Sequence, residues 1–257
     1  MILIRKFQPS DGASALRQAL RDAGHECKFT DKSAFRLPHL ILNWGGEDDP
    51  VAPNGRILNT QAARRVAMNK TLAFLALQAA NVSIPKFFTD AAAAAEFRAT
   101  LSARSNPIIL ARRTATGQGG EGITIVRMGD DVPTGNQLYT QYIRKYAEYR
   151  CHVVMGRGIV VQQKRARSDA EMTADQQLIR NSANGWVFCT DAVDSYADAV
   201  KVLAEQAADA LKLDVAAIDI IRGRDNNLYV LEANTKPGLD SPTVLSAYVN
   251  ALSRLHP

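Results

Sequence analysis

Hydrophobic and polar positions along the chain predict a first lobe built from two strands and a helix. Residues 1–7 are predicted to form a short apolar strand, and Ser10 or Asp11 can cap the following helix, whose alanines and leucines fall on one face. A second apolar run, Leu40-Ile41-Leu42, is stopped by asparagine, tryptophan and two glycines. This strand–helix–strand order predicts a small α/β lobe over residues 1–60.

Helical periodicity dominates from Thr60 to Ala80, with an interruption around Asn69. Thr89-Asp90 then caps an alanine-rich stretch, and because alanine is the best helix former we expect a surface helix to about Ala103. Extended segments with short Gly- or Asp-containing connections come next and predict an antiparallel sheet from Ile108–Leu110, Ile123–Arg127, Leu138–Ile143, Arg150–Met155 and Ile159–Gln163. The chain closes with a helix, two strands and a helix, over Ala197–Leu211, Val215–Ile221, Leu228–Ala233 and from about Ser241. The expected fold class is therefore α+β.

Composition places the chain among ordinary globular proteins and excludes disordered and fibrous classes, since 46% of its 257 residues are hydrophobic and 22% are charged. The net charge of +5 suits phosphate-bearing ligands but is too small to indicate nucleic-acid binding. Cys27, Cys151 and Cys189 are far apart and lack metal-ligand spacing, so we expect a reduced protein. The sequence shows no signal-peptide pattern and no apolar run of the ~20 residues that span a bilayer. We therefore expect a cytoplasmic location without a membrane partner.

The most informative spacing lies in the last predicted hairpin, whose two apolar strands flank a turn-forming stretch. If the hairpin is centred between Asp225 and Asn226, Asp219 faces Glu232 directly, and Asn234 lies on the same face. Two facing carboxylates among apolar side chains need a cation, and three oxygen donors without His or Cys suit Mg²⁺, with Mn²⁺ as an alternative. The competing interpretation is a solvated strand edge where these side chains meet water or an arginine.

A glycine-rich segment, residues 114–122, lies between two predicted strands. Its glycines, among them Gly117, Gly119 and Gly120, let backbone N–H groups approach a phosphate closely, and Arg112 or the arginine after it can point toward the same group. The segment lacks the Gly-Lys-Ser/Thr ending of a P-loop. A glycine-rich hairpin turn is the plain alternative.

Polar positions on the following strands can serve a nucleotide or simply the fold. The end of Leu138–Ile143 can offer backbone groups to an adenine edge, or it can be an ordinary core strand. Glu148 and Arg150 share one face, where they can take ribose hydroxyls and phosphate or form a cross-strand ion pair. Lys164-Arg165-Ala166-Arg167 is a charge cluster of the kind that is usually solvated, and Arg180-Asn181 is equally ambiguous.

In this order the segments resemble the ATP-grasp superfamily, in particular the branch of glutathione-synthetase-like and ribosomal-protein glutamate ligases. The resemblance covers about residues 60–252 and rests most on Asp219 and Glu232-Ala233-Asn234. The earlier motifs, which gain weight from their order, are Asn69-Lys70, Ile84-Pro85, Pro107–Arg112, the glycine-rich segment, Tyr139–Ile143, Glu148-Tyr149-Arg150, Gln162–Arg165 and Arg180-Asn181. The compact first lobe with Asn43-Trp44-Gly45 resembles short phage- or bacteria-associated members. The resemblance implies an ATP-grasp domain over residues 61–257, in which subdomains 61–140 and 141–257 hold ATP between them.

The resemblance also implies a role for each candidate residue. Mg²⁺ is held by Asp219, Glu232 and Asn234, and the nucleotide by Lys70, Arg112, Gly117, Gly119, Gly120, Gln141, Tyr142, Ile143, Glu148 and Arg150. The expected catalytic residues, which face the phosphate in transfer, are Arg180 and Lys164 or Arg165. Most members have a lysine near Ala111 or Arg112, so Arg112 supplies that charge here, and Gln141 stands where the hinge usually carries glutamate.

The implied reaction uses ATP to join a carboxylate to an amine through an acyl phosphate, with release of ADP, and depends on charge neutralisation and alignment more than on a protein nucleophile. The amine acceptor can be an amino acid, a peptide or a protein tail. A nucleotide-binding regulator or scaffold without ligase turnover is the alternative, and a nucleic-acid-binding module based on Lys164–Arg167 is a third interpretation. The oligomeric state, a homo-oligomer included, stays open.

Overall fold

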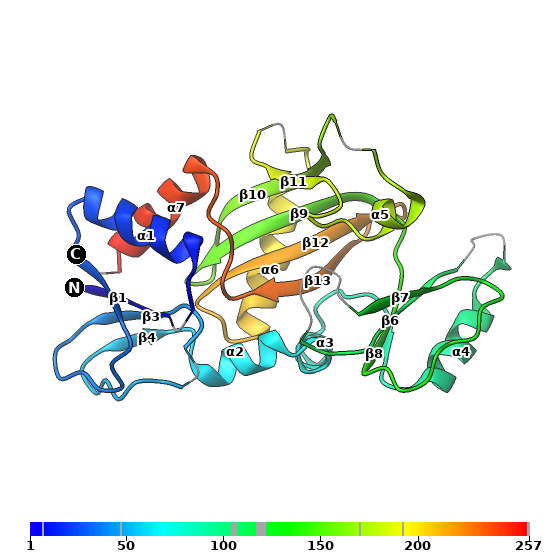
Figure 1. Ribbon diagram of the computed structural model, residues 1–257, viewed down its shortest axis with the longest axis horizontal. Coiled ribbons are helices and arrows are strands. Elements are labelled where there is room, and N and C mark those ends of the chain that lie inside the picture. The colour runs from blue at the N-terminus through cyan, green and yellow to red at the C-terminus, as the bar shows by residue number, and fades with distance from the viewer. Residues whose placement is uncertain are drawn as a thin grey trace.

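The computed structural model describes residues 1–6, 8–46, 48–103, 107–116, 122–169, 171–191 and 193–255. Within these residues the strands form one parallel and two antiparallel sheets, with helices between and behind them (Figure 1). This mixture of helices and sheets confirms the α+β fold class.

The first lobe is built on a parallel sheet with the strand order β2-β1-β3-β4. Its elements are β1 (Ile2–Arg5), α1 (Asp11–Asp22), β2 (Cys27–Thr30), β3 (Leu40–Asn43) and β4 (Arg56–Leu58). The side chain of Ser10 accepts a hydrogen bond from the backbone N–H of Ala13 at 3.2 Å, so Ser10 is the cap of α1. The sequence patterns missed β2 and β4, because these strands are short and partly exposed and lack a full apolar run.

Two consecutive helices, α2 (Gln61–Met68) and α3 (Lys70–Ala79), lead away from this lobe. Asn69 ends α2 with extended backbone angles, and its side chain accepts a hydrogen bond from the N–H of Leu72 at 3.1 Å, which starts α3. The predicted interruption at Asn69 is therefore confirmed. The break places Lys70 in the first turn of α3, from which its side chain reaches β13.

A small antiparallel sheet with the order β5-β8-β6-β7 comes next. It contains β5 (Phe87–Phe88), β6 (Ile109–Arg112), β7 (Ile123–Val126) and β8 (Leu138–Gln141), and its helix is α4 (Ala91–Thr100). Asp90 caps α4 as predicted. The helix ends at Thr100 and not near Ala103, because Leu101 adopts extended backbone angles.

The largest sheet is antiparallel and has the order β11-β10-β9-β12-β13. Its strands are β9 (Lys145–Val154), β10 (Arg157–Ala166), β11 (Trp186–Cys189), β12 (Val215–Gly223) and β13 (Leu228–Asn234). The helices of this region are α5 (Ala174–Leu178), α6 (Ala197–Ala210) and α7 (Pro242–Ser253). The expectation of one antiparallel sheet between Ile108 and Gln163 is wrong, since these strands belong to two sheets. Alternation identifies a strand but not the partner with which it pairs.

One face of the five-stranded sheet packs against α6, and the opposite face carries the polar side chains. Tyr149, Cys151 and Val153 of β9 point into a core with α6, whose small side chains Ala204 and Ala207 allow close packing. The intervening residues of β9 point to the opposite face because successive side chains of a strand alternate. Polar positions of neighbouring strands therefore collect on the face that α6 does not cover.

The last helix returns to the first lobe, where α7 lies beside α1 (Figure 1). Val244, Tyr248 and Leu252 of α7 share a core with Leu16 and Leu20 of α1. The beginning and the end of the chain therefore complete one hydrophobic core, and the loop before α7 borders the first lobe.

Candidate functional site

A cavity of about 910 Å³ lies where the first lobe, the small sheet and the five-stranded sheet meet. Every predicted site residue that the structure describes lines this cavity, except Arg165. Gly117, Gly119 and Gly120 lie outside the described residues. Residues separated by more than a hundred positions in the sequence are thus brought to one site.

Asp219 of β12 pairs directly with Glu232 of β13, as the hairpin argument predicts. The predicted centre of the hairpin is wrong, however, because a β-bulge follows Asp219 and pairs Ile220 with Val230. The hairpin is therefore centred on Asp225, and one extra residue in β13 restores the predicted pairing further from the turn.

Basic side chains neutralise both carboxylates. Arg150 donates to Asp219 from Nε at 2.7 Å and from Nη2 at 2.9 Å, and the Lys70 ammonium lies 3.0 Å from Glu232. Burial raises the pKa of Asp219 against the pull of Arg150. Burial acts on Glu232 in the same direction, but the charges of Lys70, Arg112 and Arg150 prevail and lower the pKa of its carboxyl to about 2. Asp219 thus meets an arginine, as the competing interpretation held, but it is buried on an interior strand and not at a solvated edge.

The amide of Asn234 bridges the two acids, with its nitrogen 3.4 Å from both Asp219 Oδ2 and Glu232 Oε1. The oxygen and nitrogen of an amide exchange places by a half-turn of the side chain, which would direct the carbonyl oxygen toward the carboxylates. The three residues then offer only oxygen donors, and such donors suit Mg²⁺. The residues present therefore fit a divalent cation, whose charge would take over part of the neutralisation by Arg150 and Lys70.

Arg112 ends β6 on the cavity side, whereas Ala111 is buried in the core of the small sheet. Strand alternation thus decides between the two positions that the resemblance left open. Burial lowers the pKa of the Arg112 guanidinium, and its Nε is buried without a hydrogen-bond partner in the part of the chain that is described. This donor is available to an oxygen of a ligand, whereas Arg113 is exposed and does not line the cavity.

Gln141, Tyr142 and Ile143 line the same cavity between β8 and β9. The backbone N–H of Gln141 donates to the carbonyl of Lys86 at 2.8 Å, and that of Tyr142 donates to the carbonyl of Ile108 at 3.0 Å. A bound base would therefore meet carbonyl or side-chain groups of these two residues and not their N–H groups.

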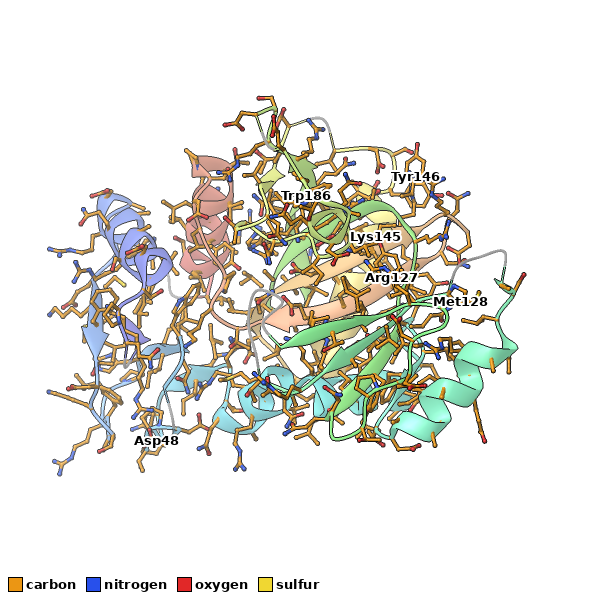
Figure 2. The ribbon with its side chains drawn as sticks, turned by 45° about the vertical axis from the view of Figure 1, so that its right-hand side comes forward. Asp48, Arg127, Met128, Lys145, Tyr146 and Trp186 are labelled. Carbon is orange, nitrogen blue, oxygen red and sulfur yellow. The ribbon has the colours of Figure 1, made fainter. Side chains whose placement is uncertain are left out.

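Glu148 lies at the centre of a buried basic cluster. It forms an ion pair with Lys164 of β10, whose ammonium also donates to the carbonyl of Arg180 at 2.7 Å. The Lys145 ammonium lies 3.8 Å from Glu148 Oε2, and no described residue donates a hydrogen bond to this oxygen. The Arg180 guanidinium stacks 4.3 Å from the ring centre of Trp186, which Figure 2 labels together with Lys145. Glu148, like Arg150, thus forms a cross-strand ion pair and also lines the cavity.

Lys145 is a site residue that the sequence patterns do not identify. Strict alternation would place it on the face opposite Glu148, but the register of β12 and β9 shifts between Arg222 and Gly223 and brings Lys145 to the Glu148 side. Its ammonium donates to the carbonyl of Leu178 at 2.6 Å, and burial lowers its pKa to about 8.

Arg165 points away from the cavity and pairs with Asp191, whereas Lys164 points inward, because adjacent residues of a strand alternate. The structure thus separates the two candidates for a catalytic charge. Arg167 is exposed, so the charge cluster Lys164–Arg167 is divided between two faces and presents no single basic patch.

His152 is buried beside the cavity wall, where its ring nitrogens lie 3.1 Å from the Tyr248 hydroxyl and 2.9 Å from Gln162 Oε1. Burial lowers its pKa to about 4, so the ring is neutral near pH 7. Because Gln162 lines the cavity, His152 supports the wall from behind and does not face the site itself.

Comparison with known proteins gives a family model and one curated relative. The model of the RimK-like ATP-grasp domain matches residues 70–247. The chain is similar to the probable alpha-L-glutamate ligase of Mannheimia succiniciproducens, with 30% identity over 202 residues. That match covers 74% of this chain and 62% of the relative, so the chain spans less than two thirds of the length of the relative.

Solved structures with the same fold include two ligases and a macrocyclase. The ATP-grasp ligase PsnB in complex with minimal precursor, Mg and ADP has a TM-score of 0.70 at 14% identity, over 98% of this chain and 96% of that one. The macrocyclase MdnC of Microcystis aeruginosa, bound with precursor peptide MdnA, has a TM-score of 0.64 at 12% identity, over 99% and 100%. The D-alanine–D-alanine ligase of Bacillus anthracis has a TM-score of 0.63 at 13% identity, over 99% and 97%. Among the described residues, no helix has the length and apolar character to cross a membrane.

Proposed function

Because the chain belongs to the RimK-like ATP-grasp domain family, whose model covers residues 70–247, we propose that it is an ADP-forming ligase that joins a carboxylate to an amine. The carboxylate oxygen attacks the γ-phosphorus of ATP, the bond from that phosphorus to the bridging oxygen breaks, and ADP leaves. The amine nitrogen then attacks the acyl carbon, inorganic phosphate leaves, and the nitrogen gives up a proton. The product is an amide.

The proposal rests on one observation, the charge arrangement in the cavity. Two acids and an amide occupy one wall, and the cavity is also lined by basic side chains at positions 70, 112, 145, 150, 164 and 180. A polyphosphate needs fixed positive charge around it, and phosphoryl transfer is catalysed chiefly by such charge and by alignment. Few other ligands would require both a basic enclosure and an oxygen-donor set for a cation.

In this proposal Arg112 and Glu148 hold the nucleotide in its ground state. The Nε of Arg112, which has no hydrogen-bond partner among the described residues, donates to a phosphate oxygen. Oε2 of Glu148, which accepts no hydrogen bond from a described residue, accepts from a ribose hydroxyl. Lys145 and Lys164 hold the Glu148 side chain in place for this purpose, because each ammonium lies beside one of its oxygens. Gln141 and Tyr142 form the wall against the base.

Asp219, Glu232 and Asn234 would hold Mg²⁺, which supplies charge neutralisation to the phosphates when bound. Lys70 helps to keep Glu232 ionised, and Arg150 fixes the orientation of the Asp219 carboxylate through two hydrogen bonds. Asn234 sits between the acids and turns its amide to present oxygen.

Lys164 and Arg180 serve the transfer step. The Lys164 ammonium is fixed between Glu148 and the carbonyl of Arg180, and the Arg180 guanidinium is fixed against Trp186. Charges held in place in this way stabilise the negative charge that develops during transfer without having to reorganise. Arg165 is left out of the site because it pairs with Asp191 outside the cavity.

The test is release of ADP from ATP and Mg²⁺ against a panel of acids and amines, with mass spectrometry of the product. Amino acids and peptides both belong in the panel, because the curated relative is named a glutamate ligase and similar structures of MdnC and PsnB hold precursor peptides. ADP release that depends on both an acid and an amine, with a product heavier by the amine less water, supports the proposal. Saturable ATP binding without turnover on any panel member would favour the regulator or scaffold alternative.

A further inference from the structure

A buried glutamine, Gln162 of β10, lies in the same row of the five-stranded sheet as two of the proposed metal ligands. It pairs with Arg150 on β9, Arg150 pairs with Asp219 on β12, and Asp219 faces Glu232 on β13. Directly opposed side chains share a face of the sheet, so Gln162 stands beside Arg150 in the cavity wall. The row therefore adds a neutral amide to the charged groups of the site.

Gln162 is joined to the last helix by a buried histidine. Gln162 Oε1 lies 2.9 Å from His152 Nε2, and His152 Nδ1 lies 3.1 Å from the hydroxyl of Tyr248 on α7. The helix packs against both β9 and β10, which brings Tyr248 to this point. His152 and Tyr248 are fully buried, and the lowered pKa of the ring keeps it neutral near pH 7, so only one ring nitrogen carries a proton.

The Tyr248 hydroxyl decides which ring nitrogen that is. Among the described residues, His152 is the only hydrogen-bond partner of this hydroxyl, so the buried hydroxyl proton is satisfied only if Nδ1 accepts it. Nε2 then carries the ring proton and donates it to Gln162 Oε1. The opposite tautomer would leave the proton of Tyr248 buried without an acceptor, which costs free energy. The orientation of the Gln162 amide is therefore fixed.

The amide nitrogen of Gln162 is left as a donor at the cavity wall, since it donates to no residue in the part of the chain that is described. The amide leans toward His152, whereas Glu148, the proposed ribose ligand, lies two residues from Arg150 in the opposite direction along β9. The donor thus lies on the far side of the metal row from the ribose. The group that attacks the γ-phosphorus approaches from this side, because it must lie opposite the bridging oxygen of the leaving ADP.

We propose that Gln162, held by His152 and Tyr248, donates a hydrogen bond from Nε2 to the carbonyl oxygen of the acyl phosphate. When the amine nitrogen bonds to the acyl carbon, the electron pair of the C=O bond moves onto this oxygen, and a fixed donor stabilises the negative charge. The pair then returns, the bond from the acyl carbon to the phosphate oxygen breaks, and one amine proton leaves with the phosphate as hydrogen phosphate. Gln162 is thus a catalytic residue, and His152 and Tyr248 are positioning residues that act through it. The inference rests on the proposed ligase function, because the acyl phosphate is an intermediate of that reaction.

Nitrogen NMR of the full chain tests this arrangement without turnover. The ring signals of His152, assigned by their loss in His152→Gln, should show the proton on Nε2. With Mg²⁺ and ADP present, acetylphosphonate, a stable mimic of an acyl phosphate, should shift the side-chain amide signals of Gln162 in a saturable way. Methylphosphonate, which lacks the acyl oxygen, should not. A ring proton on Nδ1, no shift with acetylphosphonate, or an equal shift with methylphosphonate overturns the inference.

Kinetics of variants separate catalysis from folding. With an acid and an amine that form an amide in the wild type, Gln162→Met should slow amide formation by about 100-fold and leave the KM for ATP within about twofold. His152→Leu should have a similar effect, and His152→Gln, whose amide reaches the position of Nε2, should restore part of the rate. In the Gln162→Met background, His152→Leu should cost nothing further. Gln163→Met is the matched control, because Gln163 points to the opposite face, where it accepts from the N–H of Asp194 at 3.3 Å.

The two proposals fail in different ways. Undiminished amide formation in Gln162→Met, or losses that add in the double variant, overturns the role of Gln162 and leaves the ligase proposal standing. A chain that shows the expected NMR shifts but forms no amide from any acid and amine in the panel refutes the ligase proposal instead.

Discussion

Arg150 and Asp219 lie directly opposite each other on the neighbouring strands β9 and β12, and two hydrogen bonds of 2.7 and 2.9 Å join them. Both side chains are largely buried, with 18% and 6% of their surfaces exposed, so water compensates neither charge fully. The pair therefore links the stability of the sheet to the orientation of a proposed metal ligand.

Loss of Arg150 should destabilise the fold more than loss of the whole pair. Arg150→Met leaves the Asp219 carboxylate buried without its partner, and we expect unfolding free energy to fall by about 3 kcal/mol. The double variant Arg150→Met, Asp219→Asn should recover part of this loss because no buried charge is left behind. Urea denaturation at neutral pH measures both, and a double variant no more stable than Arg150→Met would contradict the expectation.

Glu232→Gln should lower turnover by at least about 100-fold, which corresponds to about 3 kcal/mol of lost charge stabilisation, while the fold survives. The change removes a charge from the proposed metal site with little change in volume. ADP release and circular dichroism measure the two effects. Glu26→Gln is the matched control, since Glu26 is exposed in the first lobe and pairs with the exposed Lys28. Undiminished Mg²⁺-dependent ADP formation in Glu232→Gln would show that the metal is held elsewhere.

Arg112→Ala and Arg180→Ala should affect different kinetic constants. In our proposal Arg112 offers the nucleotide an Nε that has no hydrogen-bond partner among the described residues, so its loss should raise the KM for ATP by about tenfold. We propose that the Arg180 guanidinium, fixed against Trp186, acts where charge develops, so its loss should lower kcat by at least about tenfold. Arg113→Ala serves as the control because Arg113 is exposed outside the cavity. Steady-state kinetics in which both variants change only KM would refute this division of roles.

ATP affinity should weaken as the pH rises through about 8, because the pKa of Lys145 is lowered to about 8 by burial and its charge is lost there. Loss of the charge that holds Glu148 in place for the ribose corresponds to about a tenfold rise in Kd between about pH 7 and about pH 9. Lys145→Arg keeps its charge and should flatten the profile. Calorimetric titration with a non-hydrolysable ATP analogue measures it, and parallel profiles for the two proteins would exclude Lys145 as the titrating group.

Fold stability should respond to the same titration with the opposite sign. The pKa of Lys145 is lower in the folded chain than its ordinary value of 10.5, so the folded state releases its proton first. Its contribution to stability is therefore constant below about pH 8 and rises from about pH 8 to about pH 10.5. Urea denaturation across this range should show a rise in the wild type that is absent in Lys145→Arg.

Acid should destabilise the fold through His152. Its pKa is lowered by burial to about 4, against 6.5 in its ordinary state, so the unfolded chain binds a proton first as the pH falls. Stability that is fully present above about pH 6.5 should decline toward about pH 4, by up to about 3 kcal/mol. His152→Gln, which does not titrate there, should show a smaller decline in urea denaturation over the same range. An equal decline in both proteins would assign the effect to other groups.

The hairpin of β12 and β13 shows which contacts a local sequence pattern can predict and which it cannot. Alternation and turn composition predict that Asp219 faces Glu232, and the register confirms it. The same argument places the centre of the hairpin half a residue away from where it lies, since it assumes a regular ladder. A bulge depends on how β13 packs and twists against the rest of the sheet, and no local pattern encodes that.

The break at Asn69, the caps Ser10 and Asp90, and the strand identity of β12 and β13 follow from the sequence alone, because short-range hydrogen bonds and side-chain period decide them. Tertiary structure alone decides which strands pair, which of Lys164 and Arg165 faces the cavity, and that Lys145 joins them. It also decides that the end of the chain completes the core of its beginning. These properties arise from contacts between residues far apart in sequence. The sequence does not show whether water or a protein core surrounds a charged side chain. Only the packed structure distinguishes a solvated charge from a buried one.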